Sequence, residues 1–186
     1  MIAILLNDAS FEQDIRELLM AFYPGETFTH KEEEAGEADL IVRGVRDGNS
    51  FSLDVTPVKK EAVHFALIYP DFSNRFETKN EIKQTLYRLL SAQTGRELPW
   101  GTLTGIRPTK IALTKLYDGW TDEQIETYMC ETYFTSKEKI DLSIDVAERE
   151  RRLLSTIDYE NGYSLYVGIP FCPTTCLYCS FTSSPI

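Results

Sequence analysis

Hydrophobic residues at the start of the chain predict a strand followed by a helix. Residues 1–6 form an apolar run, which is typical of a buried strand. We expect Ser10 to cap the following helix and Pro24-Gly25 to end it. Over residues 11–22 the apolar side chains recur every three or four positions, as on one face of a helix: Ile15, Leu18, Leu19 and Phe22.

Three β-strands are predicted next. Residues 40–45 and 51–55 flank a turn signal at residues 47–49, and the second run alternates apolar and polar side chains. One face of this pair should therefore be buried and the other wet. Residues 63–69 are largely apolar, which predicts a third and more fully buried strand. The charge-rich residues 31–37 are expected to form a solvated loop.

Helical periodicity dominates the middle of the chain. A helix is predicted over residues 77–94, ending before Gly95, with its apolar face formed by Ile82, Leu86, Leu89 and Leu90. Residues 98–101 are typical of a linker. The first part of the chain, residues 1–98, therefore predicts an α+β domain with an antiparallel meander.

A small helical region is predicted over residues 99–158. Pro108 suits the first turn of a helix that reaches Tyr117. Capping boxes are indicated by Thr121 with Gln124 and by Thr135 with Glu138. The second of these would begin a helix over residues 137–156, with Ile140, Ile144, Ala147 and Leu154 facing inward.

The last predicted strand, residues 163–169, carries bulky side chains on both faces. This pattern fits a strand that is covered on both sides, as in a parallel sheet or a barrel. Ligand-binding loops in such folds follow the carboxyl ends of strands, and a cysteine-rich loop occupies that position here.

The cysteines are the strongest chemical signal in the sequence. Three of the four lie within eight residues, at Cys172, Cys176 and Cys179. Thiolates bind zinc, copper(I) or iron–sulfur clusters. Three ligands would leave one iron of a four-iron cluster without a protein ligand, open to a small chelating molecule. An iron–sulfur cluster with one open site is the favoured interpretation.

Zinc, a disulfide and ordinary buried thiols are the alternatives. A structural zinc site normally takes four ligands as two pairs, whereas Cys130 stands alone in a predicted helix and is expected to pack as a small apolar residue. A disulfide would leave one thiol of the three free, and nothing in the chain indicates an oxidising compartment.

Composition and charge limit the function classes. With 42% hydrophobic and 26% charged residues, the chain has the composition of a globular protein. It has no apolar stretch that would span a membrane and no basic signal-peptide start, so a cytoplasmic location is predicted. The net charge is −10 and neither half is basic, which disfavours a nucleic-acid partner.

The spacing C-x3-C-x2-C, with Tyr178 before the last cysteine, resembles the cluster loop of the radical S-adenosylmethionine (SAM) enzymes. The string from Leu165 to Cys172 and the end Tyr178–Phe181 are similar to the oxygen-independent coproporphyrinogen III oxidase group. Within that group the chain looks most like the HemZ-type coproporphyrinogen dehydrogenases, which also carry a stretch like Trp100–Lys110.

This resemblance implies a fold and a set of cofactors. After the α+β domain and the helical region, residues 159–186 would be the first strand and cluster loop of a truncated radical SAM (β/α) partial barrel. The three loop cysteines would bind a [4Fe–4S] cluster whose open iron takes SAM. Tyr178 would lie near the adenine of SAM, Phe181 would pack close to the cluster, and Tyr166 matches a cofactor-side tyrosine on the first strand of the family.

The resemblance also implies an oxidoreductase of porphyrin and haem biosynthesis. A 5′-deoxyadenosyl radical would take hydrogen from a propionate of coproporphyrinogen III, which would lose carbon dioxide and become a vinyl group. The partners would be this tetrapyrrole and an electron donor such as flavodoxin or ferredoxin. The protein would bind and orient the reactants while the cofactors supply the chemistry.

Two departures from the oxidase pattern keep other functions open. Gly168 stands where the well-known oxidases have histidine, and Phe181 stands where they have a further cysteine. Phe181 is similar to the haem-chaperone relatives. The alternatives are therefore a haem-delivery protein without oxidase activity and a radical SAM enzyme acting on another substrate, RNA included.

The cluster loop lies close to the end of the sequence. A crossover to a further parallel strand needs roughly a dozen residues, more than follow Cys179. We therefore expect the chain to be the N-terminal part of a longer protein, to be inactive alone, and to have a last strand that is poorly ordered or packs opportunistically.

Residues 104–110 form an upstream candidate site. Backbone N–H groups at a helix N-terminus, with Arg107 and Lys110 nearby, would suit a carboxylate or phosphate. The alternative is a capped helix start with two solvated bases. His30 and His64 have no partner at metal-binding spacing and are expected to be structural or solvent-facing.

Overall fold

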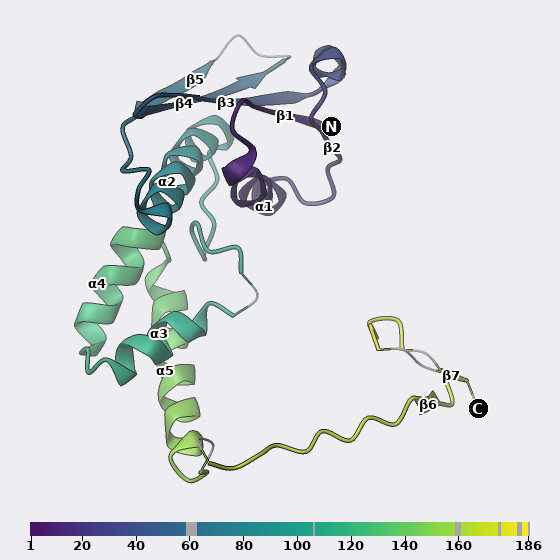
Figure 1. Ribbon diagram of the computed structural model, residues 1–186, viewed down its shortest axis with the longest axis vertical. Helices are drawn as coiled ribbons and strands as arrows, with labels where there is room; N and C mark the ends of the chain where they lie inside the picture. The colour runs from purple at the N-terminus through teal and green to yellow at the C-terminus, as the bar shows by residue number, and fades with distance from the viewer. Residues whose placement is uncertain (59–62, 106, 159–160, 175, 182–183, 186) are drawn as a thin grey trace. The chain divides into compact units, whose positions relative to one another are not determined.

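The computed structural model describes residues 1–58, 63–105, 107–158, 161–174, 176–181 and 184–185. The chain divides into two compact units, Met1–Arg151 and Arg152–Ile186. In the first unit, helices pack on a five-stranded mixed sheet (Figure 1). This confirms the α+β class predicted for the first part of the chain. The predicted boundaries at residues 98 and 158 stay predictions.

The sheet has the strand order β2-β1-β3-β4-β5. β1 is parallel to both of its neighbours, whereas β3, β4 and β5 form the predicted antiparallel meander. A two-residue turn joins β3 to β4, and its Gly48 has a φ of 56°, which favours glycine. The strands are β1 (Ile2–Leu6), β2 (Phe28–Thr29), β3 (Leu40–Asp47), β4 (Ser50–Pro57) and β5 (His64–Ile68).

The main core lies between this sheet and two helices, α1 (Glu12–Phe22) and α2 (Arg75–Thr94). Both helices cover the same face of the sheet (Figure 1). The four apolar residues predicted for α1 are completely buried, and Phe51, Leu53 and Val55 of β4 meet them from the sheet. α2 ends at Gly95, as predicted, with a φ of 68° at the cap.

The start of α1 differs from the prediction. Ser10 is not its cap, because a short 3₁₀ helix, Ala9–Phe11, precedes α1. Asp8 caps that turn instead, and its carboxylate accepts a hydrogen bond from the Ser10 backbone N–H at 2.9 Å. Asp8 also pairs with Arg46 at 3.1 Å, which ties this turn to β3. The sequence therefore marked the helix start correctly within a few residues but assigned the cap to the wrong side chain.

The charge run at residues 31–37 is more ordered than a solvated loop. Glu32–Glu37 form a 3₁₀ helix, η2, whose Ala35 packs with Ala3 and Leu5 of β1. Its acidic side chains remain outside, where Glu32 makes a two-pronged pair with Arg43 at 2.7 and 3.2 Å. The segment covers the second face of β1, so β1 is buried on both sides.

The third strand of the meander is not more fully buried. β5 is the last strand at one side of the described sheet, and its residues alternate between half-buried and exposed. Phe65 is 61% exposed and Leu67 is 47% exposed. The helices cover only one face of the meander. The apolar run at residues 63–69 therefore does not indicate burial on both faces, as the prediction assumed.

The helical region contains α3 (Thr109–Tyr117), α4 (Asp122–Tyr133) and α5 (Lys137–Leu154). Thr121 and Gln124 form the predicted capping box at the start of α4. The box predicted at Thr135 is wrong, since its buried hydroxyl has no hydrogen-bond partner among the described residues. The helices share a core of Ala112, Leu113, Leu116, Ile125, Met129, Ile140, Ile144 and Ala147.

No helix in the described part of the chain is both long enough and apolar enough to cross a membrane.

Candidate metal centre

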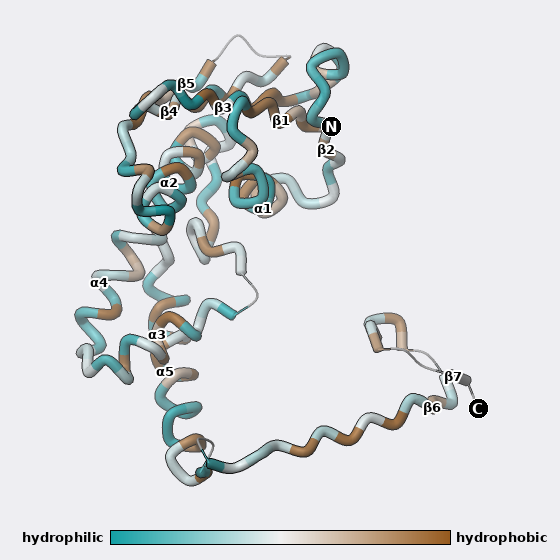
Figure 2. Tube along the Cα trace, viewed as in Figure 1, coloured by the Kyte–Doolittle hydropathy of each residue, from teal (hydrophilic) through white to brown (hydrophobic). Residues whose placement is uncertain are grey.

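Residues 163–170, which lead to the cysteine loop, are not a strand. They carry no β pairing in the structure, and the short strand β6 begins only at Phe171. Figure 2 shows hydrophobic residues recurring along this stretch. The predicted strand over 163–169 is thus absent, because its backbone N–H and C=O groups have no partner strand among the described residues.

Pairing in the second unit is limited to two short strands. β6 (Phe171–Cys172) runs parallel to β7 (Ser184–Pro185), with Phe171 opposite Ser184 and Cys172 opposite Pro185. The apolar side chains before β6 remain exposed, among them Leu165, Val167 and Ile169. This stretch therefore has the alternation of a strand without the burial that would stabilise one.

All three loop cysteines are free thiols. Cys172 and Cys179 are half-buried, and Cys176 is exposed. A turn connects the last two, in which the Cys179 backbone N–H donates to the Cys176 carbonyl at 3.0 Å. The fourth thiol, Cys130 on α4, is also exposed, so the prediction that it packs as a small apolar residue is wrong. The buried residues of α4 near it are Ile125 and Met129.

Two of the three cysteines face one hollow, which we call the cysteine hollow. It has a volume of about 480 Å³, and Cys172 and Cys179 both line it. Tyr166 and Phe181 line the same hollow, together with Val167, Gly168, Ile169 and Pro170. Tyr178 does not line it and is 91% exposed. The roles predicted for these three aromatic residues stay predictions.

The three cysteines are chemically suited to a metal centre that prefers sulfur ligands. Three thiols within one short loop are the ligand type that iron–sulfur clusters and zinc take. Among the described residues, no three side chains of the His, Cys, Asp or Glu type lie close enough together to hold a metal ion. The cluster ligands therefore remain a prediction that rests on spacing and donor chemistry.

The upstream candidate site at residues 104–110 stays a prediction, and its described residues make other contacts in the structure. The Arg107 guanidinium forms an ion pair with Glu150 of α5. The Glu150 carboxylate therefore takes the place that a bound anion would have beside Arg107. Ile106 of this stretch lies outside the described residues. Thr104 instead donates to Glu17 of α1 at 2.8 Å, a contact with no sequence signature, because the two residues are distant in the chain.

Neither histidine belongs to a metal site in the described structure. His30 Nε2 lies 2.8 Å from Glu12 Oε1 in an exposed pair, and His64 is half-buried on β5. Lys83 is a buried charged residue that sequence reasoning missed. It is a charged residue in the middle of α2, yet it is buried, and its ammonium donates to Thr104 at 2.9 Å.

Comparison with known proteins identifies a relative. The chain is 36% identical over 135 residues to the oxygen-independent coproporphyrinogen-III oxidase-like protein HemZ of Bacillus subtilis (strain 168). The match covers 70% of this chain and 26% of that protein, so the chain spans about a quarter of its relative. The two are homologous, which confirms the resemblance seen in the sequence. No protein-family model and no solved structure matches the chain.

Proposed function

Because the chain is a homologue of HemZ, we propose that it is the N-terminal part of a radical SAM oxidoreductase of porphyrin and haem biosynthesis. Its substrate would be coproporphyrinogen III, whose propionates undergo oxygen-independent oxidative decarboxylation. The observation that carries the proposal is the C-x3-C-x2-C loop, in which Cys172, Cys176 and Cys179 supply three thiols.

Each part of the loop has a separate task in this proposal. The three cysteines would hold a [4Fe–4S] cluster with one open coordination site for SAM. When bound, the cluster supplies the electron that cleaves SAM to the radical that starts the reaction. Tyr166 and Phe181 support the proposal by lining the same hollow as Cys172 and Cys179, where they would contact the bound cofactors.

The first experiment tests the metal. Anaerobic reconstitution of the full-length protein with iron and sulfide should give about four irons per chain and broad visible absorbance, as expected for three-cysteine ligation of a cubane. Replacing any one loop cysteine by Ala should abolish or strongly reduce that absorbance. Cys130→Ala is the matched control, because Cys130 lies on α4, and it should leave the absorbance unchanged. Stoichiometric zinc in the purified protein would overturn the proposal.

The second experiment tests the reaction. The reconstituted full-length protein, given SAM, a strong reductant and coproporphyrinogen III, should release 5′-deoxyadenosine and a vinyl-bearing product. Intact SAM under these conditions would contradict radical SAM chemistry. Cleavage of SAM without vinyl product would contradict the proposed substrate and leave the cofactor assignment standing.

A haem-delivery protein is the second candidate function. Phe181 favours it, because this residue stands where the well-known oxidases carry a further cysteine and is similar to the haem-chaperone relatives. Phe181 is 71% exposed, so it is accessible to a flat apolar ligand. Tight haem binding with no turnover of coproporphyrinogen would select this function. A Phe181→Cys variant distinguishes the two candidates further, since it should lower haem affinity only if Phe181 contacts haem.

A further inference from the structure

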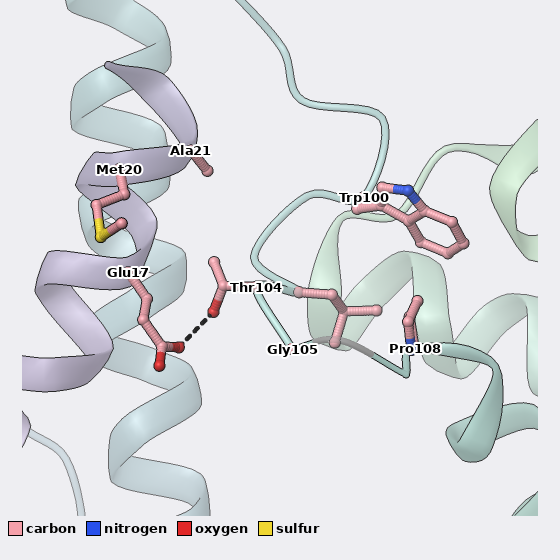
Figure 3. A pocket seen from close by; sticks show the side chains of 8 residues that line it. Glu17, Met20, Ala21, Trp100, Thr104, Gly105 and Pro108 are labelled. Carbon is pink, nitrogen blue, oxygen red and sulfur yellow. Dashed lines mark hydrogen bonds between the residues drawn. The ribbon is translucent and has the colours of Figure 1, made fainter. Parts of the chain in front are cut away.

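A second hollow lies within the first unit, between α1 and residues 100, 103–105 and 108 (Figure 3). Its volume is about 590 Å³, which is enough for a small organic molecule. We call it the Glu17 hollow. Its walls combine apolar surface with a few polar atoms, and the side chains that matter for its chemistry are Glu17, Met20, Trp100, Leu103, Thr104 and Pro108.

Hydrogen bonds fix the polar wall of this hollow. The Thr104 hydroxyl donates its only proton to Glu17 Oε2 at 2.8 Å, as Figure 3 shows, and accepts from Lys83 Nζ at 2.9 Å. Gln13 Nε2 donates to the other carboxylate oxygen, Glu17 Oε1, at 3.1 Å. A carboxylate can accept about four hydrogen bonds, so Glu17 keeps acceptor positions for a ligand.

Lys83 supports this wall from behind. Only 7% of Lys83 is exposed, and the residue does not line the hollow. Burial lowers the pKa of Lys83, and the nearby carboxylates of Asp14 and Glu17 partly offset that effect. Lys83 thus fixes which way the Thr104 hydroxyl points. Among the described residues that line the hollow, only Glu17 is charged, and its carboxylate also interacts with the charge of Lys83.

We propose that the Glu17 hollow binds a small organic cation, a protonated amine carried on a flat apolar body. The ammonium group would donate to the free acceptor positions of Glu17, in a charge-assisted hydrogen bond. The apolar body would pack against Trp100 and Pro108, which lie across from Glu17 in Figure 3, and against Leu103, which also lines the hollow.

The sign of the charge that lines the Glu17 hollow decides whether a cation or an anion fits. The sequence of residues 104–110 offered a candidate site for an anion, with Arg107 and Lys110 as the cations, or else a capped helix start with two solvated bases. Arg107 is paired with Glu150, and neither Arg107 nor Lys110 lines the hollow. The lining charge is negative, and the net charge of the chain, −10, attracts cations further.

The test compares three probes of one shape. Phenethylamine, 2-phenylethanol and phenylacetate share a phenyl ring and differ in charge, and their binding to the full chain can be followed by calorimetry and ligand-observed NMR. Phenethylamine should bind at least about tenfold more tightly than either other probe, because only it can donate a charged hydrogen bond to Glu17. Equal binding of all three, preferential binding of phenylacetate, or no binding at millimolar concentration would overturn the proposal.

Two variants and one control locate the binding site. Glu17→Gln should weaken phenethylamine binding about tenfold, because the amide keeps the shape but loses the charge. Met20→Trp should block the hollow with a larger side chain, since Met20 lines the hollow and is half-exposed. Glu123→Gln is the control, because Glu123 lines a different hollow on α4. Thermal unfolding of each variant checks that it folds, and unchanged binding in both test variants would overturn the assignment.

Discussion

Gly101 lies so close to the backbone of Tyr133 that a Cβ atom on Gly101 would fall 1.9 Å from the Tyr133 carbonyl oxygen. The same oxygen accepts a hydrogen bond from the Thr102 backbone N–H at 2.7 Å, and the Pro99 carbonyl accepts one from the Ser136 N–H at 2.9 Å. The predicted linker is therefore fastened to the connection between α4 and α5. It is a packed element of the first unit that happens to lack regular secondary structure.

We predict that Gly101→Ala strongly destabilises the protein. Its φ of 56° already strains an L-residue, and the added methyl would collide with backbone atoms that cannot move aside. Together these effects should cost about 3 kcal/mol or more of unfolding free energy. Gly119→Ala is the matched control, because Gly119 has a φ of 80° with nothing within 4 Å, and it should cost only about 1 kcal/mol. Similar urea midpoints for both variants would show that the contact with Tyr133 is not tight.

Thr121→Ala should weaken the start of α4. The Thr121 hydroxyl accepts from the Gln124 N–H at 3.3 Å, and the Gln124 side chain accepts from the Thr121 N–H at 2.9 Å. Losing this reciprocal cap should lower stability by about 1 kcal/mol in chemical denaturation. Thr127→Ala, at an exposed position within the same helix, should change stability by less than about 0.5 kcal/mol. A larger effect at Thr127 than at Thr121 would argue against the capping box.

Asp8 should contribute stability that depends on pH. Hydrogen bonds from Ser10 and the pair with Arg46 lower the pKa of Asp8. The unfolded carboxyl then binds more protons than the folded one in acid, so the stabilisation is present above the unfolded pKa, near 3.8, and is lost as the pH falls through the folded pKa.

The comparison of Asp8→Ala with the parent protein tests this contribution. At neutral pH the variant should be about 1 kcal/mol less stable, since it loses a cap, and the gap should narrow in acid. Asp8→Asn keeps an acceptor but cannot ionise, so it should keep most of the stability without the pH-dependent part. A gap for Asp8→Ala that stays constant down to pH 2 would contradict the assignment.

Thr104→Val should test how far the buried Lys83 depends on its hydrogen bond to Thr104. Valine preserves the shape of threonine but leaves the buried ammonium of Lys83 without that partner, which should cost about 1–3 kcal/mol. In the double variant with Lys83→Met the buried charge is gone, so the second substitution should recover part of the loss. A double-mutant cycle in urea measures the coupling, and strictly additive effects would show that the two residues do not interact.

Local periodicity made much of the first unit predictable. The face of α1, the meander β3-β4-β5, the glycine end of α2 and the capping box at Thr121 all depend on residues close in sequence. The parallel pairing of β1 with β3 was not predictable in the same way, because it joins distant segments. The exposure of β5 was missed for a related reason: an apolar run does not tell which layers cover it.

The candidate sites differ in the same way: one lies within a short stretch of sequence, and the other is built from distant segments. Spacing alone predicted Cys172, Cys176 and Cys179, because a metal loop keeps its ligands in one short stretch. The Glu17 hollow is assembled from α1 and a segment far away in the sequence, so no local pattern could indicate it. Lys83 was missed because a lysine in a helix is usually solvated, and only the tertiary packing shows that it is buried.

The mixed sheet also bears on how the chain acquires its structure. β3 and β4 pair from the two-residue turn that joins them. Because this hairpin closes only a short loop, it should form early. β1 should pair with β3 later, because α1, β2 and η2 lie between the two strands in the sequence. Closing this longer loop carries a larger entropic penalty. A ribosome would release the first strand long before its neighbour exists, which leaves the apolar Ile2–Leu6 unprotected during synthesis and makes it a segment on which chaperones would act.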